Sequence, residues 1–394
     1  MQDNILMHPY NGLMRDFAKR TGLDPEGPTD RYLWTDSFAV CNYLGQYRNR
    51  NDNKDLEMAL RLIDQVHSTL GKYSPDDTRS GWLSNLSEEE GLIRPTIGGL
   101  RIGKPLLERA ADEPYDPDVE WERDGQYYHY LTKWIHALAQ TGLVAEDIQY
   151  IEQGIELALT IHTAFIHETR HSSRKSLYWK MSVDLSRPLV SSMGRHDALD
   201  GYLTYVELDT AGDILQPGRR KQLVAEISEL AMICRGTNWE TNDPLGVGSL
   251  LFNGCRMAQL IRRGALTDAS MLSNILRSAL PGLEAIRSSN LLEHDAEDRL
   301  AFRELGLAIG LRGVSLIRNS LLSQADAYGN AINMRLIQEL MQYLPMSDSI
   351  ESFWALPDNR LSDTWRMHQN INDVMLATCM EPHGLLRFQP YQVP

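Results

Sequence analysis

Residues 124–168 read "DGQYYHYLTKWIHALAQTGLVAEDIQYIEQGIELALTIHTAFIHE" and contain two helical patterns of different kinds. The second pattern, from residue 145 onward, places Ile148, Ile151 and Phe165 at helical spacing with polar residues between them. It predicts a helix with one solvent-exposed face. The first pattern has a wider apolar face, which predicts a more deeply buried helix. Together the two patterns predict a helical hairpin with an inner and an outer helix.

The same alternation recurs along the chain. Segments with one polar stripe, predicted to be outer helices, cover residues 10–22, 53–73, 145–168, 218–236 and 267–289. Segments with wide apolar faces, predicted to be inner helices, cover residues 31–49, 125–141, 196–210, 243–264, 298–323 and 361–380. The inner segments carry many glycines, each of which costs about 1 kcal/mol relative to Ala in a helix. Their number predicts that the inner helices approach one another closely.

Six inner segments alternating with outer ones predict an all-α fold, an (α/α)6 toroid of six helical hairpins. Strand signals are nearly absent. We expect one domain over residues 1–394. By this architecture, over its whole length, the chain resembles the six-hairpin superfamily of glycoside hydrolases, polysaccharide lyases and N-acylglucosamine 2-epimerases. The resemblance implies a carbohydrate-active enzyme.

Two long segments, about 74–124 and 172–195, lack the helical pattern and lead into inner helices. Connections of this length in a compact domain are often functional. We expect both segments to be loops that cover one rim of the toroid, where the resemblance implies the cleft.

Composition narrows the classes of function. The formal net charge is −14, which disfavours nucleic acid or an anionic membrane as a partner. No window approaches the roughly 18 apolar residues of a membrane span, and the first residues have no signal-peptide pattern. The four cysteines form no CxxC pair, which is typical of reduced, buried thiols. We therefore expect a cytoplasmic protein.

Carboxylates and histidines gather where the inner helices begin. Asp197 and Asp200 are three residues apart and share a helical face, so each raises the pKa of the other, which favours an acid at neutral pH. An aspartate at a helix start is also a common N-cap, and a histidine in an apolar helix is commonly a hydrogen-bonded core group. The candidate catalytic residues are Asp36, Asp124, His129, His196, Asp197, Asp200 and His368.

Aromatic side chains accompany these groups. Tryptophan and tyrosine faces can stack on sugar rings, although each ring taken singly could serve only packing. The candidate substrate-binding residues are Trp34, Trp82, Trp121, Tyr128, Trp179, Arg303, Trp354 and Trp365.

Residues His167–His171 match the zinc-protease pattern H-E-x-x-H. The pattern is short enough to arise by chance. Arg170 lies inside it, and four polar or charged residues follow it, whereas a zinc-binding helix is usually buried. We therefore interpret the motif as the polar end of an outer helix and expect no metal and no cofactor.

Several functions remain open. A glycoside hydrolase would draw an acid–base pair from Asp36, Asp124, Asp197 and Asp200, and it is our first hypothesis. In the epimerase branch, histidines facing the barrel centre act as acid and base, which the resemblance implies for His129, His196 or His368. A terpene-cyclase-like enzyme with an aromatic-lined pore and a non-catalytic scaffold are further alternatives. We expect a small-molecule substrate, a sugar, with a homodimer as one option. Substrate identity and stereochemical outcome are left open.

Overall fold

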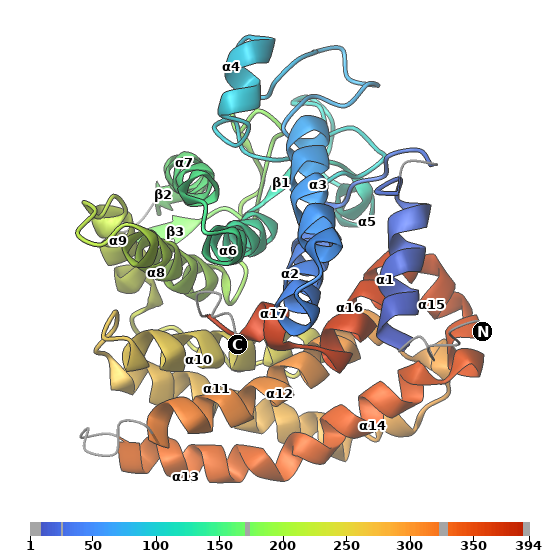
Figure 1. Cartoon of the computed structure of the whole chain (residues 1–394), viewed down its shortest axis with the longest axis vertical. Helices are drawn as coiled ribbons and strands as arrows, with labels where there is room; N and C mark the ends of the chain where they lie inside the picture. The colour runs from blue at the N-terminus through green and yellow to red at the C-terminus, as the bar shows by residue number, and fades with distance from the viewer. Residues whose placement is uncertain (1–8, 25–26, 170–173, 323–329, 389–394) are drawn as a thin grey trace. The chain divides into compact units, whose positions relative to one another are not determined.

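The computed structural model describes residues 9–24, 27–169, 174–322 and 330–388. Its contacts divide the chain into two compact units. One is Pro28–Thr237, and the other combines Asn238–Phe388 with the N-terminal helix α1 (Pro9–Arg20) (Figure 1). We refer to them as the 28–237 unit and the 238–388 unit.

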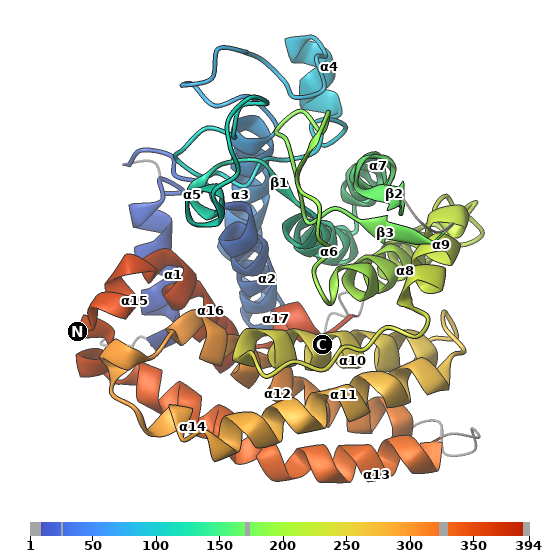
Figure 2. The same cartoon turned by 180° about the vertical axis from the view of Figure 1, so that it is seen from behind.

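Three inner helices form the centre of the 28–237 unit. They are α2 (Leu33–Arg50), α6 (Tyr128–Ala145) and α8 (Asp197–Leu215). Helix α2 packs against α6, and α6 packs against α8. Each inner helix is followed by an outer helix that packs on it: α3 (Asn53–Leu70), α7 (Ile148–Phe165) and α9 (Val224–Cys234) (Figure 2). The predicted hairpins are therefore present in this unit.

Side-chain caps mark where the outer helices α3 and α7 start. The carboxylate of Asp52 accepts a hydrogen bond from the Lys54 amide at the start of α3, and Asp147 does the same for Gln149 at α7. Each cap satisfies one of the amides that the first turn of a helix leaves without a partner. Asp147 is thus the last residue of the short connection between α6 and α7, the two helices predicted within residues 124–168.

The segments between the hairpins are more ordered than the sequence predicts. Residues 74–124 include two short helices, α4 (Glu88–Ile93) and α5 (Pro117–Glu122). Strands β1 (Gln126–Tyr127), β4 (Lys180–Met181) and β5 (Pro188–Val190) form an antiparallel sheet in the order β1–β4–β5, and β2 (Ile166–Glu168) pairs with β3 (Lys175–Leu177). These short elements were not predicted, because strands of two or three residues are too short to show alternation.

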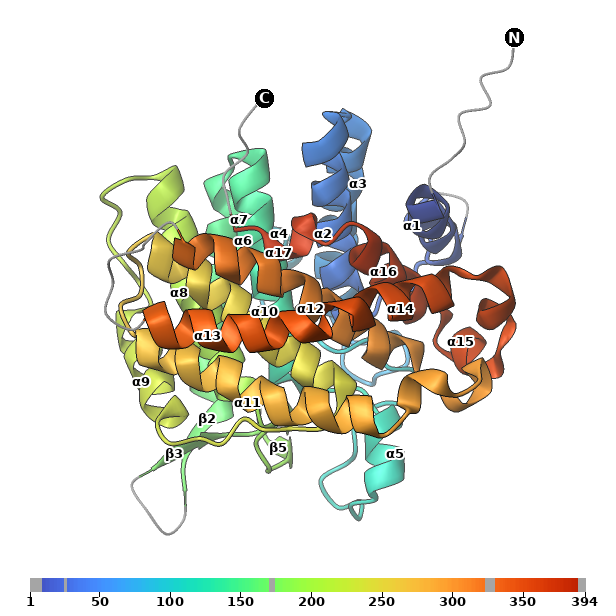
Figure 3. The same ribbon diagram turned by 90° about the horizontal axis from the view of Figure 1, so that it is seen from below.

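The 238–388 unit repeats the inner and outer arrangement. Its inner helices are α10 (Pro244–Arg262), α12 (Ala301–Leu322) and α16 (Gln369–Met380), and α12 packs against both of the others. The outer helices are α11 (Ala269–Ser288), α13 (Asn330–Leu340), α14 (Leu344–Ala355) and α1 (Pro9–Arg20) (Figure 3). Short elements complete the unit: η1 (Leu291–Glu293), η2 (Ala296–Asp298), η3 (Met341–Tyr343), η4 (Pro357–Leu361), α15 (Asp363–Met367) and α17 (His383–Leu386).

The last inner helix is shorter than predicted. The pattern over 361–380 predicts one helix, but the chain forms α15 and α16, with His368 between them outside helical geometry. Helix α1 packs on α16, and Arg20 forms an ion pair with Asp373 at 2.5 Å. The expected role of the N-terminal segment as an outer helix is therefore confirmed.

Glycines allow α10 and α12 to pack backbone against backbone. A Cβ atom on Gly248 would lie 2.1 Å from the Gly306 carbonyl oxygen, and one on Gly310 would lie 2.3 Å from the Gly248 oxygen. Real Cβ atoms do not approach other atoms this closely, so only glycine fits. The predicted close approach of inner helices is confirmed for this pair.

The all-α fold, with inner and outer helices alternating in the (α/α)6 order, is thus confirmed. Among the described residues, one helix, α12, is long and apolar enough to cross a membrane by length and composition. Two thirds of its apolar window is buried within the protein, as in the core helix of a helical domain.

Candidate active site

Three pairs of ionisable side chains connect α6 to α8 in the 28–237 unit. On α6 they occupy positions separated by four and three residues, which is one helical face. The pairs are His129 Nδ1–Asp197 Oδ1 at 4.0 Å, Lys133 Nζ–Asp200 Oδ2 at 3.0 Å and His136 Nδ1–Glu207 Oε2 at 2.8 Å. Only His129 among these six is more than marginally exposed, with 25% of its side chain accessible. Of the three pairs, the one formed by His129 and Asp197 is therefore the one that a substrate can reach.

His129 combines access with an uncharged ring. Burial lowers the pKa of its imidazole to about 4, although the negative charge of Asp200 raises it. The ring is therefore neutral at pH 7 and can accept a proton. Its Nδ1 atom is buried and has no hydrogen-bond partner among the described residues. The accessible part of the ring accordingly excludes Nδ1, which faces Asp197.

Asp197 titrates close to neutral pH. The pKa of its carboxyl group is raised to about 7, chiefly by burial and also by the nearby charge of Asp200, against the lowering effects of a hydrogen bond from the Gly194 amide and of Lys133. The predicted effect of Asp200 on Asp197 is thus present, but burial is the larger cause. Since Asp197 is only 4% exposed, it is placed to act on His129.

A short sheet brings aromatic rings to His129. In the β1–β4 pair, Tyr127 lies opposite Lys180, which places Trp179 beside the start of α6. The Trp179 ring is stacked parallel to His129 at 6.0 Å, and Tyr127 and Tyr130 lie within 5.3 Å of the same imidazole. Trp121, 45% exposed, lies 5.6 Å from Trp179. Trp121 and Trp179, both predicted from sequence, therefore lie near His129.

Sequence reasoning did not select Tyr32 and Tyr130. Their hydroxyl groups are 2.6 Å apart, and their rings meet edge to face at 5.6 Å. Trp34, a predicted binding residue, lies 6.5 Å from Tyr130 but is only 8% exposed. A single tyrosine before an inner helix has no distinguishing pattern, so its pairing with a ring 98 positions away was not predictable.

Two predicted acids are held in structural ion pairs. Asp124 is buried, receives a hydrogen bond from Arg101 at 2.9 Å and accepts the amides of Gly103 and Gly125. Asp36 lies 3.5 Å from the Arg31 guanidinium and accepts the Tyr32 amide. Burial raises the pKa of Asp36 to about 6. These contacts hold the chain in place just before α2 and α6. This structural role explains why both carboxylates are buried there and requires no catalytic role for either.

Other predicted residues have buried or capping positions. Tyr128 is fully buried, and a Cβ atom on Gly201 would collide with its hydroxyl. Trp82 is 2% exposed and donates to Glu88 at 3.1 Å, so its ring packs inside the 28–237 unit and offers little surface to a ligand. His196 occupies the N-cap position of α8, without a side-chain cap bond, beside Asp197.

The remaining predicted residues belong to the 238–388 unit. Trp354 and Trp365 are buried, and Trp354 donates to Glu304 at 2.9 Å, so both rings pack inside this unit and offer little surface to a ligand. Arg303 pairs with Asp243 at 2.5 Å at the start of α10. His368 is half-buried and lies edge to face with Phe302 at 5.4 Å.

We expected the H-E-x-x-H segment to form the end of an outer helix, but helix α7 ends at Phe165, before the motif begins. His167 and Glu168 lie in strand β2, where successive side chains point to opposite faces, and His171 falls outside the described residues. The His167 ring stacks on Tyr178 at 3.8 Å. Within the described parts of the chain, no group of three His, Cys, Asp or Glu side chains could hold a metal ion.

Comparisons with known proteins give distant structural likenesses. No protein-family model matches the chain, and no curated protein matches its sequence. A sugar epimerase from a ruminal bacterium has a TM-score of 0.49 and 11% identity, covering 89% of this chain and 87% of that chain. Cellobiose 2-epimerase from Spirochaeta thermophila has a TM-score of 0.45 and 12% identity, and the match covers 87% of this chain and 99% of that chain. Cellobiose 2-epimerase from Bacillus thermoamylovorans has a TM-score of 0.49 and 9% identity, and the match covers 96% of this chain and 99% of that chain.

Proposed function

We propose that this protein is a carbohydrate-active enzyme of the isomerase or epimerase type, which moves a proton at the carbon next to a sugar carbonyl. One observation carries the proposal: the neutral, accessible imidazole of His129 has its buried Nδ1 atom 4.0 Å from the Asp197 carboxyl group. A neutral imidazole can act as a general base, and a buried carboxylate beside its other nitrogen stabilises the imidazolium that forms. The aromatic rings around it suit the flat faces of a sugar.

His129 is the proposed catalytic residue. The imidazole accepts the proton from the sugar carbon through Nε2, and the electron pair of the C–H bond moves toward the carbonyl oxygen. Asp197, as a positioning residue, then stabilises the imidazolium through Nδ1–H. Hydrogen bonds at catalytic groups commonly shorten when substrate binds. Return of the proton by His129 to the former carbonyl carbon, with the proton of the neighbouring hydroxyl passing to the former carbonyl oxygen, gives isomerisation. Epimerisation needs a second acid that protonates the original carbon from the opposite face, while His129 keeps the proton it has taken.

The geometry favours this proposal over a glycoside hydrolase. Hydrolysis needs two carboxyl groups on either side of the scissile bond. Asp36 and Asp124 are both buried in ion pairs, and Asp200 pairs with Lys133. Asp197 lies behind His129 and has little access of its own.

Solvent exchange tests the proposal. The protein is incubated in D₂O with a panel of aldoses, ketoses and reducing disaccharides, and NMR follows deuterium incorporation at the carbon next to the carbonyl. We expect incorporation with at least one sugar and a loss of about 100-fold or more in His129→Gln. His162→Gln, on outer helix α7, is the matched control and should keep the rate. Full activity of His129→Gln, or reducing-sugar release without exchange, would refute the proposal.

A further inference from the structure

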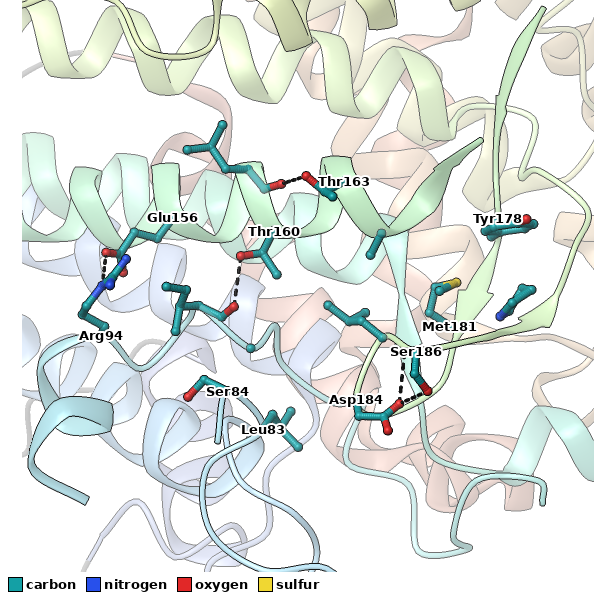
Figure 4. Close-up of a pocket in the computed structure, with 16 residues that line it drawn as sticks. Leu83, Ser84, Arg94, Glu156, Thr160, Thr163, Tyr178, Met181, Asp184 and Ser186 are labelled. Atoms are coloured by element: carbon teal, nitrogen blue, oxygen red, sulfur yellow. Dashed lines mark hydrogen bonds and ion pairs between the residues drawn. The ribbon is translucent and has the colours of Figure 1, made fainter. Parts of the chain in front are cut away.

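A groove on the 28–237 unit lies outside the cluster around His129. It has a volume of about 870 Å³, within the range of roughly 300–1,000 Å³ that is typical of small-ligand sites. Its walls come from α7, from the segment 83–98 and from the turn between β4 and β5. Figure 4 shows Arg94 and Glu156 at one end and Tyr178 at the other.

The charged groups of the groove are already paired. Arg94 Nε lies 2.6 Å from Glu156 Oε1. Asp184 accepts hydrogen bonds from Ser182 and Ser186 and forms an ion pair with Arg79 at 3.1 Å, and these contacts lower the pKa of its carboxyl group against the effect of burial. A charged ligand would have to compete with these partners, so the walls favour a neutral one.

The uncharged polar groups present hydrogen-bond acceptors. Thr160 donates its hydroxyl proton to the Ile97 carbonyl at 3.0 Å, and Thr163 donates to Leu159 at 2.9 Å. Each hydroxyl oxygen keeps lone pairs that can accept from a ligand. These acceptors suit a ligand with several O–H donors.

Apolar surface lies between the polar groups. Leu83, Leu159 and Met181 line the groove, and Leu159 is 37% exposed. Tyr178 contributes an aromatic ring that is held by its stacking on His167. A sugar ring combines an apolar face of C–H groups with hydroxyls at its edge, which matches this pattern of walls.

We propose that this groove binds a neutral oligosaccharide at a site separate from the proposed catalytic centre. The apolar faces of its sugar rings pack on Tyr178 and Leu159, and its hydroxyls donate to Thr160 and Thr163. The ion pair of Arg94 and Glu156 closes one end. The proposal rests on the groove itself and does not require the proposed reaction at His129.

Calorimetric titration of the full chain with cellotetraose and maltotetraose tests the site. We expect one of these neutral probes to bind, and Thr163→Lys and Tyr178→Ala to weaken that binding about tenfold or more. Gln149→Lys places the same charge at an exposed position of α7 away from the groove, and it should bind like the wild type.

The outcomes separate this site from the catalytic proposal. If binding persists in His129→Gln but is lost in Thr163→Lys, the groove is the site. If Thr163→Lys binds normally, or if neither probe binds the wild type, the groove proposal is overturned. Deuterium exchange by Thr163→Lys is measured in parallel, so failure of either proposal is recognised independently.

Discussion

The Lys133 ammonium lies 3.0 Å from the Asp200 carboxylate, and both side chains are buried between α6 and α8. This ion pair lies one turn below His129 and Asp197. It balances the charge of Asp200, which raises the pKa of both Asp197 and His129. The pair therefore links the stability of the two inner helices to the electrostatics of the proposed site.

Lys133→Met should destabilise the protein by about 3–5 kcal/mol, because it removes the ammonium group that balances the buried Asp200 carboxylate. Urea unfolding measures the loss. The double variant Lys133→Met/Asp200→Leu should recover much of it, because removing both charges also removes their desolvation cost. A double variant as unstable as the single one would show that the pair does not act as a unit.

Activity should fall as the pH drops below about 7. Asp197 has a pKa of about 7, and the proposed mechanism needs its ionised form beside His129. The pH profile of kcat/KM measures this limb. Asp197→Asn should lower the plateau and remove the limb near pH 7, whereas a pure packing role would lower activity equally at every pH.

Stability should change with pH in the opposite sense. The folded-state pKa of Asp197 is raised from 3.8 to about 7, so its protonated form is favoured by folding. This contribution is fully present below about pH 4 and is lost as the pH rises through 7. Relative to wild type, Asp197→Asn should therefore be more stable at pH 8 than at pH 5, which urea unfolding at both values measures. An equal difference at both pH values would contradict the raised pKa.

Gly310→Ala should destabilise the 238–388 unit by about 1–3 kcal/mol, because the added Cβ would overlap the Gly248 carbonyl oxygen. Thermal unfolding followed by circular dichroism measures the change. Gly12→Ala in α1 is the matched control, since nothing lies within 4 Å of its Cβ position. The control should be neutral or more stable by about 0.5–1 kcal/mol, because alanine is the better helix former. Equal effects of the two substitutions would contradict the close packing.

Trp121→Ala should raise KM for the sugar substrate by about tenfold and leave the fold intact, because the ring is 45% exposed beside Trp179. Steady-state kinetics and the unfolding midpoint measure the two effects. Trp82→Ala gives the contrast, since removing that buried ring should cost about 3–5 kcal/mol of stability. An unchanged KM in Trp121→Ala would exclude the ring from substrate binding.

The inner and outer helices were predictable because each has a long apolar face that repeats with the helical period. The short elements were not. Strands β1 and β4 have two residues each, and their pairing joins positions more than fifty residues apart. No local pattern records such a contact. Two local signals in residues 74–124 could have predicted its short helices: the capping box of Ser87 and Glu90 at α4, and Asp116 followed by Pro117 at the start of α5.

For the candidate site, sequence patterns selected His129, Asp197 and Asp200 as chemically capable residues, and their helical spacing implied shared faces. The same patterns also selected Asp124, Trp82 and Trp354. Only tertiary contacts distinguished the two groups, because an aspartate paired with Arg101 and one facing a neutral imidazole look alike in a sequence. By itself, then, the sequence determined the helical hairpins, whose amphipathic periodicity is local. The tertiary structure decided which ionisable groups are paired, buried or accessible, because burial and distance across helices set their charge and pKa.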